Sequence, residues 1–195
     1  MPRPSQVDAK RQQLLPALAK TFAELGYRRA TTAELAHRCN VQENILYRLW
    51  PDKKAMFIAA IDHIYERSVD VWEKLLSGNA HTHSAQALLE YEAEHLGEFG
   101  HARIIFAGLS ETDDPEIRSA LARMYQRYQK FVESQLLQHG RLHGTPQNEP
   151  ALAAWAFVGL GTVISIAREL RLLSQKERSR LMLHVGQLLL HGHAE

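Results

Sequence analysis

The chain has 195 residues, of which 45% are hydrophobic and 23% are charged. This composition is typical of a globular protein and excludes a disordered or fibrous chain. The single cysteine excludes an intramolecular disulfide, and no basic segment followed by an apolar run marks a secretory signal at the start. We therefore expect a cytoplasmic protein of one or two domains.

The net charge of +1 conceals an uneven distribution along the chain. Residues 1–54 contain ten Lys or Arg and five Asp or Glu, whereas residues 55–195 contain thirteen and seventeen. A basic N-terminal part on an acidic body indicates that the N-terminal part binds a polyanion such as nucleic acid.

The first predicted helix carries an apolar face from Leu14 to Leu25 and is expected to end at Gly26. Pro16 lies inside this pattern, where its ring and missing N–H predict a kink or an irregular arm before it. Similar helical spacing recurs along the rest of the chain, and no alternating run is long enough for a strand. The sequence therefore predicts an all-α fold.

Eight further helices are predicted from capping and proline signals. Thr31 and Glu34 form a capping box for the second helix, which should end near Asn40. The later helices are expected at about 43–49, 52–76, 84–100, a short segment near 104–106, 115–140, 151–172, and from the capping box at 174–177. The last two should form an antiparallel hairpin.

The second and third helices have the spacing of a helix-turn-helix. Ala36 provides the small contact between the helices, and Asn40 tolerates the positive φ of the turn. The inward apolar positions are Leu35, Cys39, Val41, Leu46 and Leu49. An inward Cys39 thiol should be inert.

In this motif the third helix enters the major groove of DNA. The residues expected at base edges are Gln42, Glu43, Asn44 and Arg48. The residues expected at phosphates are Thr32, Tyr47, Lys53 and Lys54. For each of them the alternative is an ordinary solvated surface side chain.

Residues 14–57 resemble the DNA-binding domain of TetR-family repressors. The resemblance lies in the segments 22–27, 31–36, 40–41, 46–47 and 50–53 with the apolar pair at 56–57. Gln42 departs from it, because a Ser cap is usual there, and the third helix should start less sharply. The resemblance implies a dimer with a helix-turn-helix domain at 1–54 and a ligand-binding and dimerisation domain at 55–195.

The segment Ala151–Ala167 carries no charge over 17 residues. This length is close to the minimum for a helix that spans a membrane, so we prefer a helix that is buried at a twofold interface between subunits. The alternative is a hairpin whose contacts all lie within one subunit. With the next helix it would form a four-helix bundle between two subunits. The residues expected at this interface are Ala154, Trp155, Val158, Gly161, Ser165, Leu183, Gly186 and Leu190.

The middle of the chain carries aromatic and histidine side chains that could build a pocket for a small-molecule effector. The candidates are Tyr65, Trp72, Tyr91, His95, Phe99, Phe106, Met124 and Tyr128. The alternative is an ordinary core whose polar tips are hydrogen-bonded. Together with the family resemblance, these residues predict a repressor that binds a palindromic operator in double-stranded DNA and is released from it by a small-molecule ligand. The alternative is a DNA-binding protein that does not respond to a ligand.

Metal binding and catalysis are less well supported. Three histidine pairs, at 81 and 83, 139 and 143, and 191 and 193, lack a third ligand fixed nearby, so we expect surface histidines and no metal. No phosphate loop, nucleophile elbow or His-Glu-x-x-His motif occurs. Glu94 with His95 could still act as an acid–base pair, but we expect no cofactor and no enzyme.

Overall fold

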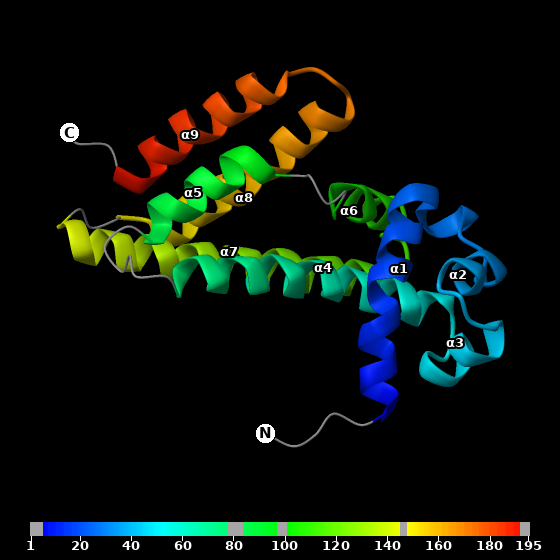
Figure 1. The fold of residues 1–195 in the computed structure, drawn as a ribbon. Coiled ribbons are helices and arrows are strands. Elements are labelled where there is room, and N and C mark those ends of the chain that lie inside the picture. Colours follow the sequence, from blue (N-terminus) through cyan, green and yellow to red (C-terminus); the bar gives the residue numbers. More distant parts are fainter. Residues whose placement is uncertain (1–5, 78–83, 97–100, 145–147, 192–195) are drawn as a thin grey trace. The chain divides into compact units, whose positions relative to one another are not determined.

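A computed structural model describes residues 6–77, 84–96, 101–144 and 148–191 (Figure 1). All regular elements within these residues are helices, as predicted. They are α1 (Gln6–Arg29), α2 (Thr32–Arg38), α3 (Glu43–Leu49), α4 (Lys53–Leu76), α5 (Ser84–His95), α6 (His101–Leu109), α7 (Pro115–His143), α8 (Pro150–Glu169) and α9 (Gln175–His191).

The helices form two compact units. The first unit contains residues 1–67 and 100–124, and the second contains residues 68–99 and 125–195. Helices α4 and α7 each begin in the first unit and continue into the second. The first unit thus extends beyond the expected boundary at residue 54, because α6 packs on α1 and the first half of α4 completes the same core.

The core of the first unit is built from the apolar faces that the helical periodicity predicts. The largest fully buried side chains there are Leu18, Phe22, Leu35, Leu46, Met56, Phe57, Ile61, Ile64, Ile104, Ile117 and Met124. Phe22 meets Phe57 edge to face, with ring centroids 4.9 Å apart. These aromatic contacts join α1 to α4, so the helix-turn-helix rests on the start of α4.

Helix α1 differs from its prediction at one end. It runs from Gln6 through Pro16 with helical dihedral angles, so the irregular arm expected before Pro16 is wrong. The proline is exposed, and the helix instead breaks at Gly26, where φ is +75° and ψ is 169°. Gly26 therefore acts as the predicted stop signal, although a further helical turn follows to Arg29.

The predicted caps of the later helices are confirmed. Asp52 accepts a hydrogen bond from the Ala55 amide at 2.7 Å, and Asp114 accepts from the amide of Glu116 at 2.9 Å. At the start of α9, the Ser174 amide donates to the Glu177 carboxylate at 2.8 Å, and the Glu177 amide donates back to Ser174 Oγ at 3.3 Å. Such caps stabilise the otherwise unpaired first amides of a helix.

The second unit is held together by α5, α8 and α9. Helix α9 packs on both α5 and α8, and α8 and α9 form the predicted hairpin (Figure 1). Gly186 of α9 allows the closest approach, because a Cβ atom there would lie 2.2 Å from Cδ1 of Leu89 on α5. Helix α8 ends at Glu169, earlier than predicted, and Arg171 turns the chain with φ of +55°.

Helix α8 is exceptional in its apolar character. Among the described helices it is the one whose length and hydropathy would also suit a membrane span, but 22% of its apolar window is already buried in the chain. A core or interface helix of a globular protein has the same composition.

Candidate DNA interface

Helix α3 presents one polar face and one buried face. Leu46 and Leu49 are buried, whereas the residues predicted to reach DNA are exposed: Gln42, Glu43, Asn44, Tyr47 and Arg48. A helix of seven residues is unstable alone, so this arrangement depends on packing against its neighbours. The exposed face is what direct base readout requires.

The turn before α3 has the predicted geometry. Asn40 adopts φ of +52°, and the Val41 amide donates to the carbonyl oxygen of Ala36 at 3.0 Å. Cys39 is buried beneath the turn, and burial raises the pKa of its thiol to about 11. Cys39 is therefore an apolar packing residue, as expected. Gln42, at the N-cap of α3, makes no side-chain hydrogen bond to the helix, which agrees with its departure from the family pattern.

The C-terminal end of α3 is fixed by a residue that the sequence did not indicate. The Arg11 guanidinium donates to the carbonyl oxygen of Leu49 from Nε at 2.8 Å and from Nη2 at 2.6 Å. Arg11 lies on α1, 38 residues away in the chain. Two charge-assisted hydrogen bonds to the last turn of α3 hold the recognition helix against α1.

Thr32 and Tyr47, both predicted at phosphates, lie next to each other. The Tyr47 hydroxyl donates to Oγ1 of Thr32 at 3.4 Å, and 49% of the Tyr47 surface is exposed. Thr31 caps α2 by accepting from the Glu34 amide at 3.2 Å. The amides at the start of α2 therefore lie next to these two hydroxyls, an arrangement suited to a phosphate.

Lys53 and Lys54 already have partners within the protein. Lys53 Nζ donates to the Tyr27 carbonyl oxygen at 3.1 Å and lies 4.5 Å from the centre of the Tyr27 ring. Lys54 pairs with Asp114 at 3.3 Å and also with Glu116. Lys54, which was predicted at a phosphate, thus forms ion pairs that join α4 to the start of α7.

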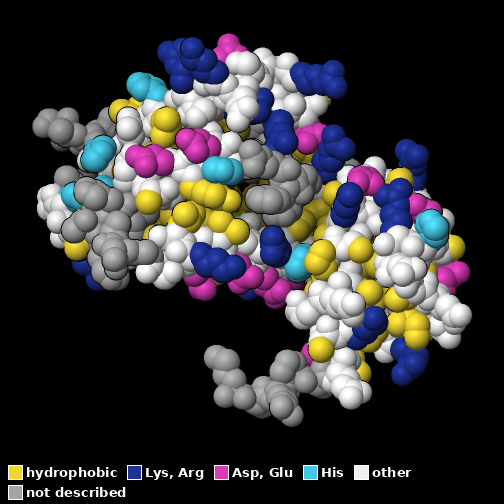
Figure 2. Space-filling view, in the orientation of Figure 1, with side chains coloured by type: hydrophobic (Ala, Val, Ile, Leu, Met, Phe, Trp, Pro, Cys, Tyr) yellow, Lys and Arg dark blue, Asp and Glu magenta, His cyan; other side chains and the backbone are white. Residues whose placement is uncertain are grey.

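Charges of both signs are interspersed on the face of the first unit seen in Figure 2. Arg38 bridges Glu24 of α1 and Glu34 of α2, and Arg28 pairs with Glu111 at 2.8 Å. These pairs fix helices to one another. By contrast, Arg48 forms no ion pair within the described residues, so its charge is available to a ligand.

The residues predicted to line an effector pocket are divided between the two units. Tyr65, Phe106 and Met124 belong to the first unit, Trp72, Tyr91, His95 and Tyr128 belong to the second, and Phe99 lies outside the described residues. Met124 is fully buried in the core of its unit.

In the second unit the polar tips of these side chains are hydrogen-bonded. Trp72 Nε1 donates to Glu92 at 2.6 Å, and the Tyr128 hydroxyl lies 3.1 Å from Ser68 Oγ. Tyr91 stacks on His95 with ring centroids 4.3 Å apart. This arrangement matches the alternative of a packed core.

A pocket in the second unit is lined by a different set of residues. It has a volume of about 100 Å³ and lies among α5, α8 and α9. Its charged residues are Glu92, Glu94, Arg168 and Arg178. Of these the sequence indicated only Glu94, as a possible acid–base partner of His95. Burial raises the pKa of Glu92, although the Trp72 hydrogen bond and His95 act in the opposite direction. The eight predicted residues do not contribute to this pocket.

The residues predicted at a dimer interface also fall into two groups. Ala154, Ser165, Gly186 and Leu190 are buried within the subunit, so their contacts are intramolecular and the prediction is corrected for them. Val158, Gly161 and Leu183 are partly covered, and Trp155 is 44% exposed. The exposed stripe of α8 consists of Leu152, Trp155, Gly159, Val163 and Ile166, and the C-cap residue Leu170 continues it.

One histidine differs from its prediction as a surface residue. His139 is buried, its ring stacks on that of His143 with centroids 4.2 Å apart, and it meets the His191 ring at 5.7 Å. No three His, Cys, Asp or Glu side chains in the described ranges are placed to hold a metal ion. His81, His83 and His193 lie outside those ranges.

Comparison with known proteins agrees with this geometry. Residues 14–60 match the family described as bacterial regulatory proteins, tetR family. The nucleoid occlusion factor SlmA of Pasteurella multocida (strain Pm70) is 27% identical over 155 residues, which are 74% of this chain and 75% of that protein. The factor of the same name from Haemophilus influenzae (strain PittGG) is 46% identical over 59 residues, 30% of this chain and 27% of that one.

Solved structures share the fold along the whole chain. A TetR-family transcriptional regulator from Cytophaga hutchinsonii has a TM-score of 0.78 at 16% identity, with 100% of both chains covered. The fatty acid degradation regulator FadR from Bacillus halodurans has a TM-score of 0.75 at 18% identity, again with 100% of both chains covered. The helix-turn-helix is thus that of the tetR family of bacterial regulatory proteins, and the chain as a whole shares the fold of solved TetR-family regulators.

Proposed function

We propose that the chain is a dimeric repressor that binds a palindromic operator and is released from it by a small molecule. The observation that carries the proposal is the division of α3 into a buried face and an exposed face of Gln42, Asn44 and Arg48. Asn pairs well with adenine and Arg with guanine in the major groove. Each such pair contributes about 1–3 kcal/mol of discrimination against a wrong base.

Dimerisation is supported by the uncovered apolar stripe of α8. Its members recur at spacings of three and four residues, which places them on one side of the helix. A stripe of this kind on a globular protein is a site for another surface. A twofold pairing through α8 and α9 would cover it and would give two recognition helices for a symmetric operator.

A sedimentation experiment tests the dimer. Trp155→Asp places a charge in the exposed stripe, and we expect it to convert a dimer into a monomer that binds the operator much more weakly. Leu142→Asp is the matched control, because Leu142 is an exposed apolar residue of α7 outside the stripe. Wild-type protein that sediments as one subunit at micromolar concentration would contradict the dimer.

The operator is accessible through selection from random duplex DNA. We expect recovered sequences to contain two inverted half-sites about one helical turn apart, roughly 34–36 Å. A single half-site in all selected sequences would contradict a symmetric dimer on DNA.

Release by a ligand requires that the ligand bind the two states of the protein with different affinity. Helix α4 belongs to both units, and its orientation is the proposed link between ligand and DNA.

A second candidate function comes from the relatives named nucleoid occlusion factors, one of which matches 74% of this chain. Chromatin immunoprecipitation distinguishes the two candidates. A few binding sites at promoters would support a repressor, whereas many sites spread over the chromosome, with a cell-division phenotype on deletion, would support nucleoid occlusion.

A further inference from the structure

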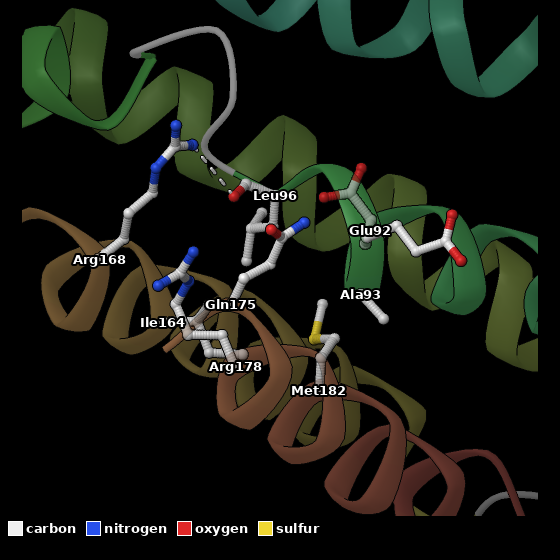
Figure 3. A pocket seen from close by; sticks show the side chains of 9 residues that line it. Glu92, Ala93, Leu96, Ile164, Arg168, Gln175, Arg178 and Met182 are labelled. Carbon is white, nitrogen blue, oxygen red and sulfur yellow. Dashed lines mark hydrogen bonds between the residues drawn. The ribbon is translucent and has the colours of Figure 1, made fainter. Parts of the chain in front are cut away.

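The pocket of the second unit brings two arginines and two glutamates together with a few apolar side chains. Arg168 extends from the last turn of α8 toward the end of α5, and Arg178 lies on the early turns of α9 beside Ile164 (Figure 3). Both side chains are half-buried. Three separate helices therefore meet around one hollow of about 100 Å³.

The two guanidinium groups keep donors available in this pocket. Arg168 Nη1 reaches the Leu96 carbonyl oxygen at 3.5 Å, which is a long contact, and Arg178 Nη1 donates to the Leu173 carbonyl oxygen at 2.6 Å. No carboxylate forms an ion pair with either group within the described residues. A guanidinium has five N–H donors in a planar fork that matches a carboxylate.

The other walls limit what such an anion can be. Leu96, Ile164 and Met182 provide apolar surface, and the last two are buried. Glu92 and Glu94 both lie on the α5 side and would repel a second negative charge. The hollow of about 100 Å³ suits a ligand of a few heavy atoms.

We propose that this pocket binds a small organic monocarboxylate, with the carboxylate against Arg168 and Arg178 and the alkyl end over Ile164 and Met182. An apolar floor suits an alkyl group and does not suit a free phosphate, which is polar on all sides. A dicarboxylate would place its second charge near Glu92. The claim that the bound monocarboxylate acts as an effector rests on the proposed function. The claim that the pocket binds a monocarboxylate does not.

Calorimetry with the full chain tests binding directly. Sodium butyrate, sodium succinate and sodium phosphate are titrated at constant ionic strength, and we expect saturable binding of butyrate alone. Arg168→Gln should weaken butyrate binding about tenfold or more, because it removes charge-assisted hydrogen bonds. Arg180→Gln removes the same charge from an exposed position of α9 and should leave binding unchanged.

A second measurement uses the wild-type protein and does not depend on a variant that folds. In methyl NMR spectra, butyrate should shift the Met182 resonance in a saturable manner and leave the buried Met56 of the first unit unchanged. Absence of saturable binding, preference for phosphate or succinate, or an equal affinity in Arg168→Gln would overturn the proposal.

The outcomes separate this inference from the proposed function. If butyrate binds at Arg168 and the operator affinity does not change, the pocket stands and release by this ligand fails. If the protein binds an operator and no monocarboxylate, the pocket fails and the DNA-binding function stands.

Discussion

Arg11 of α1 binds the carbonyl oxygen of Leu49, the last residue of α3, through two nitrogen atoms of its guanidinium group. This contact orients α3, although Arg11 is not part of the exposed face of α3. It makes the N-terminal part of α1 a support for recognition.

Loss of this support should be measurable. Arg11→Gln should lower the free energy of unfolding by about 1.5–3 kcal/mol, the range expected for hydrogen bonds that involve a charged group. It should also weaken operator binding, because α3 loses its anchor on α1. Lys20→Gln is the control, since it removes a positive charge from an exposed position of the same helix. Urea unfolding that gives equal stability for both variants would contradict this role of Arg11.

The turn of the helix-turn-helix gives a second prediction. Asn40 has φ of +52°, and a residue with a Cβ and no polar side chain is strained there by about 1–2 kcal/mol. We expect Asn40→Ala to destabilise the protein by about 1 kcal/mol and Asn40→Gly to be neutral or stabilising. Thermal unfolding of both variants decides the matter: a destabilised glycine variant would show that the Asn40 side chain has a different role.

The ion pairs of Lys54 predict a pH dependence. Burial alone would raise the pKa of Asp114, but the amides of Ile117 and Glu116 and the Lys54 ammonium stabilise its carboxylate, and the net shift is downward. A lowered pKa in the folded state gives stability that is present above the ordinary value of 3.8 and is lost as the pH falls below it. Lys54→Gln should therefore lower the melting temperature at pH 7 and much less at pH 3.

For the same variant, operator binding at neutral pH should remain close to that of the wild type, because Lys54 is occupied by carboxylates. A normal melting temperature together with a strongly reduced affinity for DNA would instead show that Lys54 contacts DNA.

Glu92 should show the opposite pH dependence. Burial raises its pKa, so the folded state holds this proton more tightly than the unfolded state does. Its contribution to stability is greatest below the ordinary value of 4.5 and decreases as the pH rises through the raised pKa. Glu92→Gln keeps an acceptor for Trp72 and should gain stability relative to the wild type as the pH rises above 4.5. A stability difference that is constant with pH would show that the Glu92 pKa is not raised.

Local sequence signals were sufficient for the helix-turn-helix. Thr31, Asn40 and Asp52 act on backbone groups within a few residues, so their effects could be predicted without knowledge of the tertiary fold. The capping box at Ser174 and Glu177 is of the same kind. These signals place the start and end of helices, and the helical period then gives the buried faces.

Contacts between distant residues could not be predicted in this way. The Arg11 contact joins residues 38 apart, and Lys54 and Glu116 are 62 apart. Gly186 was expected at an intersubunit crossing, yet its close contact is with Leu89 in the same chain. Periodicity identifies that a face is apolar, but the helix that covers it depends on the packing of the whole unit.

The most direct test of α3 as the DNA-reading element is fluorescence anisotropy with the selected operator and a scrambled duplex at one salt concentration. We expect the wild-type protein to prefer the operator by at least about a thousandfold. The double variant Asn44→Ala with Arg48→Ala should lose most of this preference while it keeps the wild-type melting temperature. An operator preference unchanged in that variant would show that another part of the protein reads the DNA.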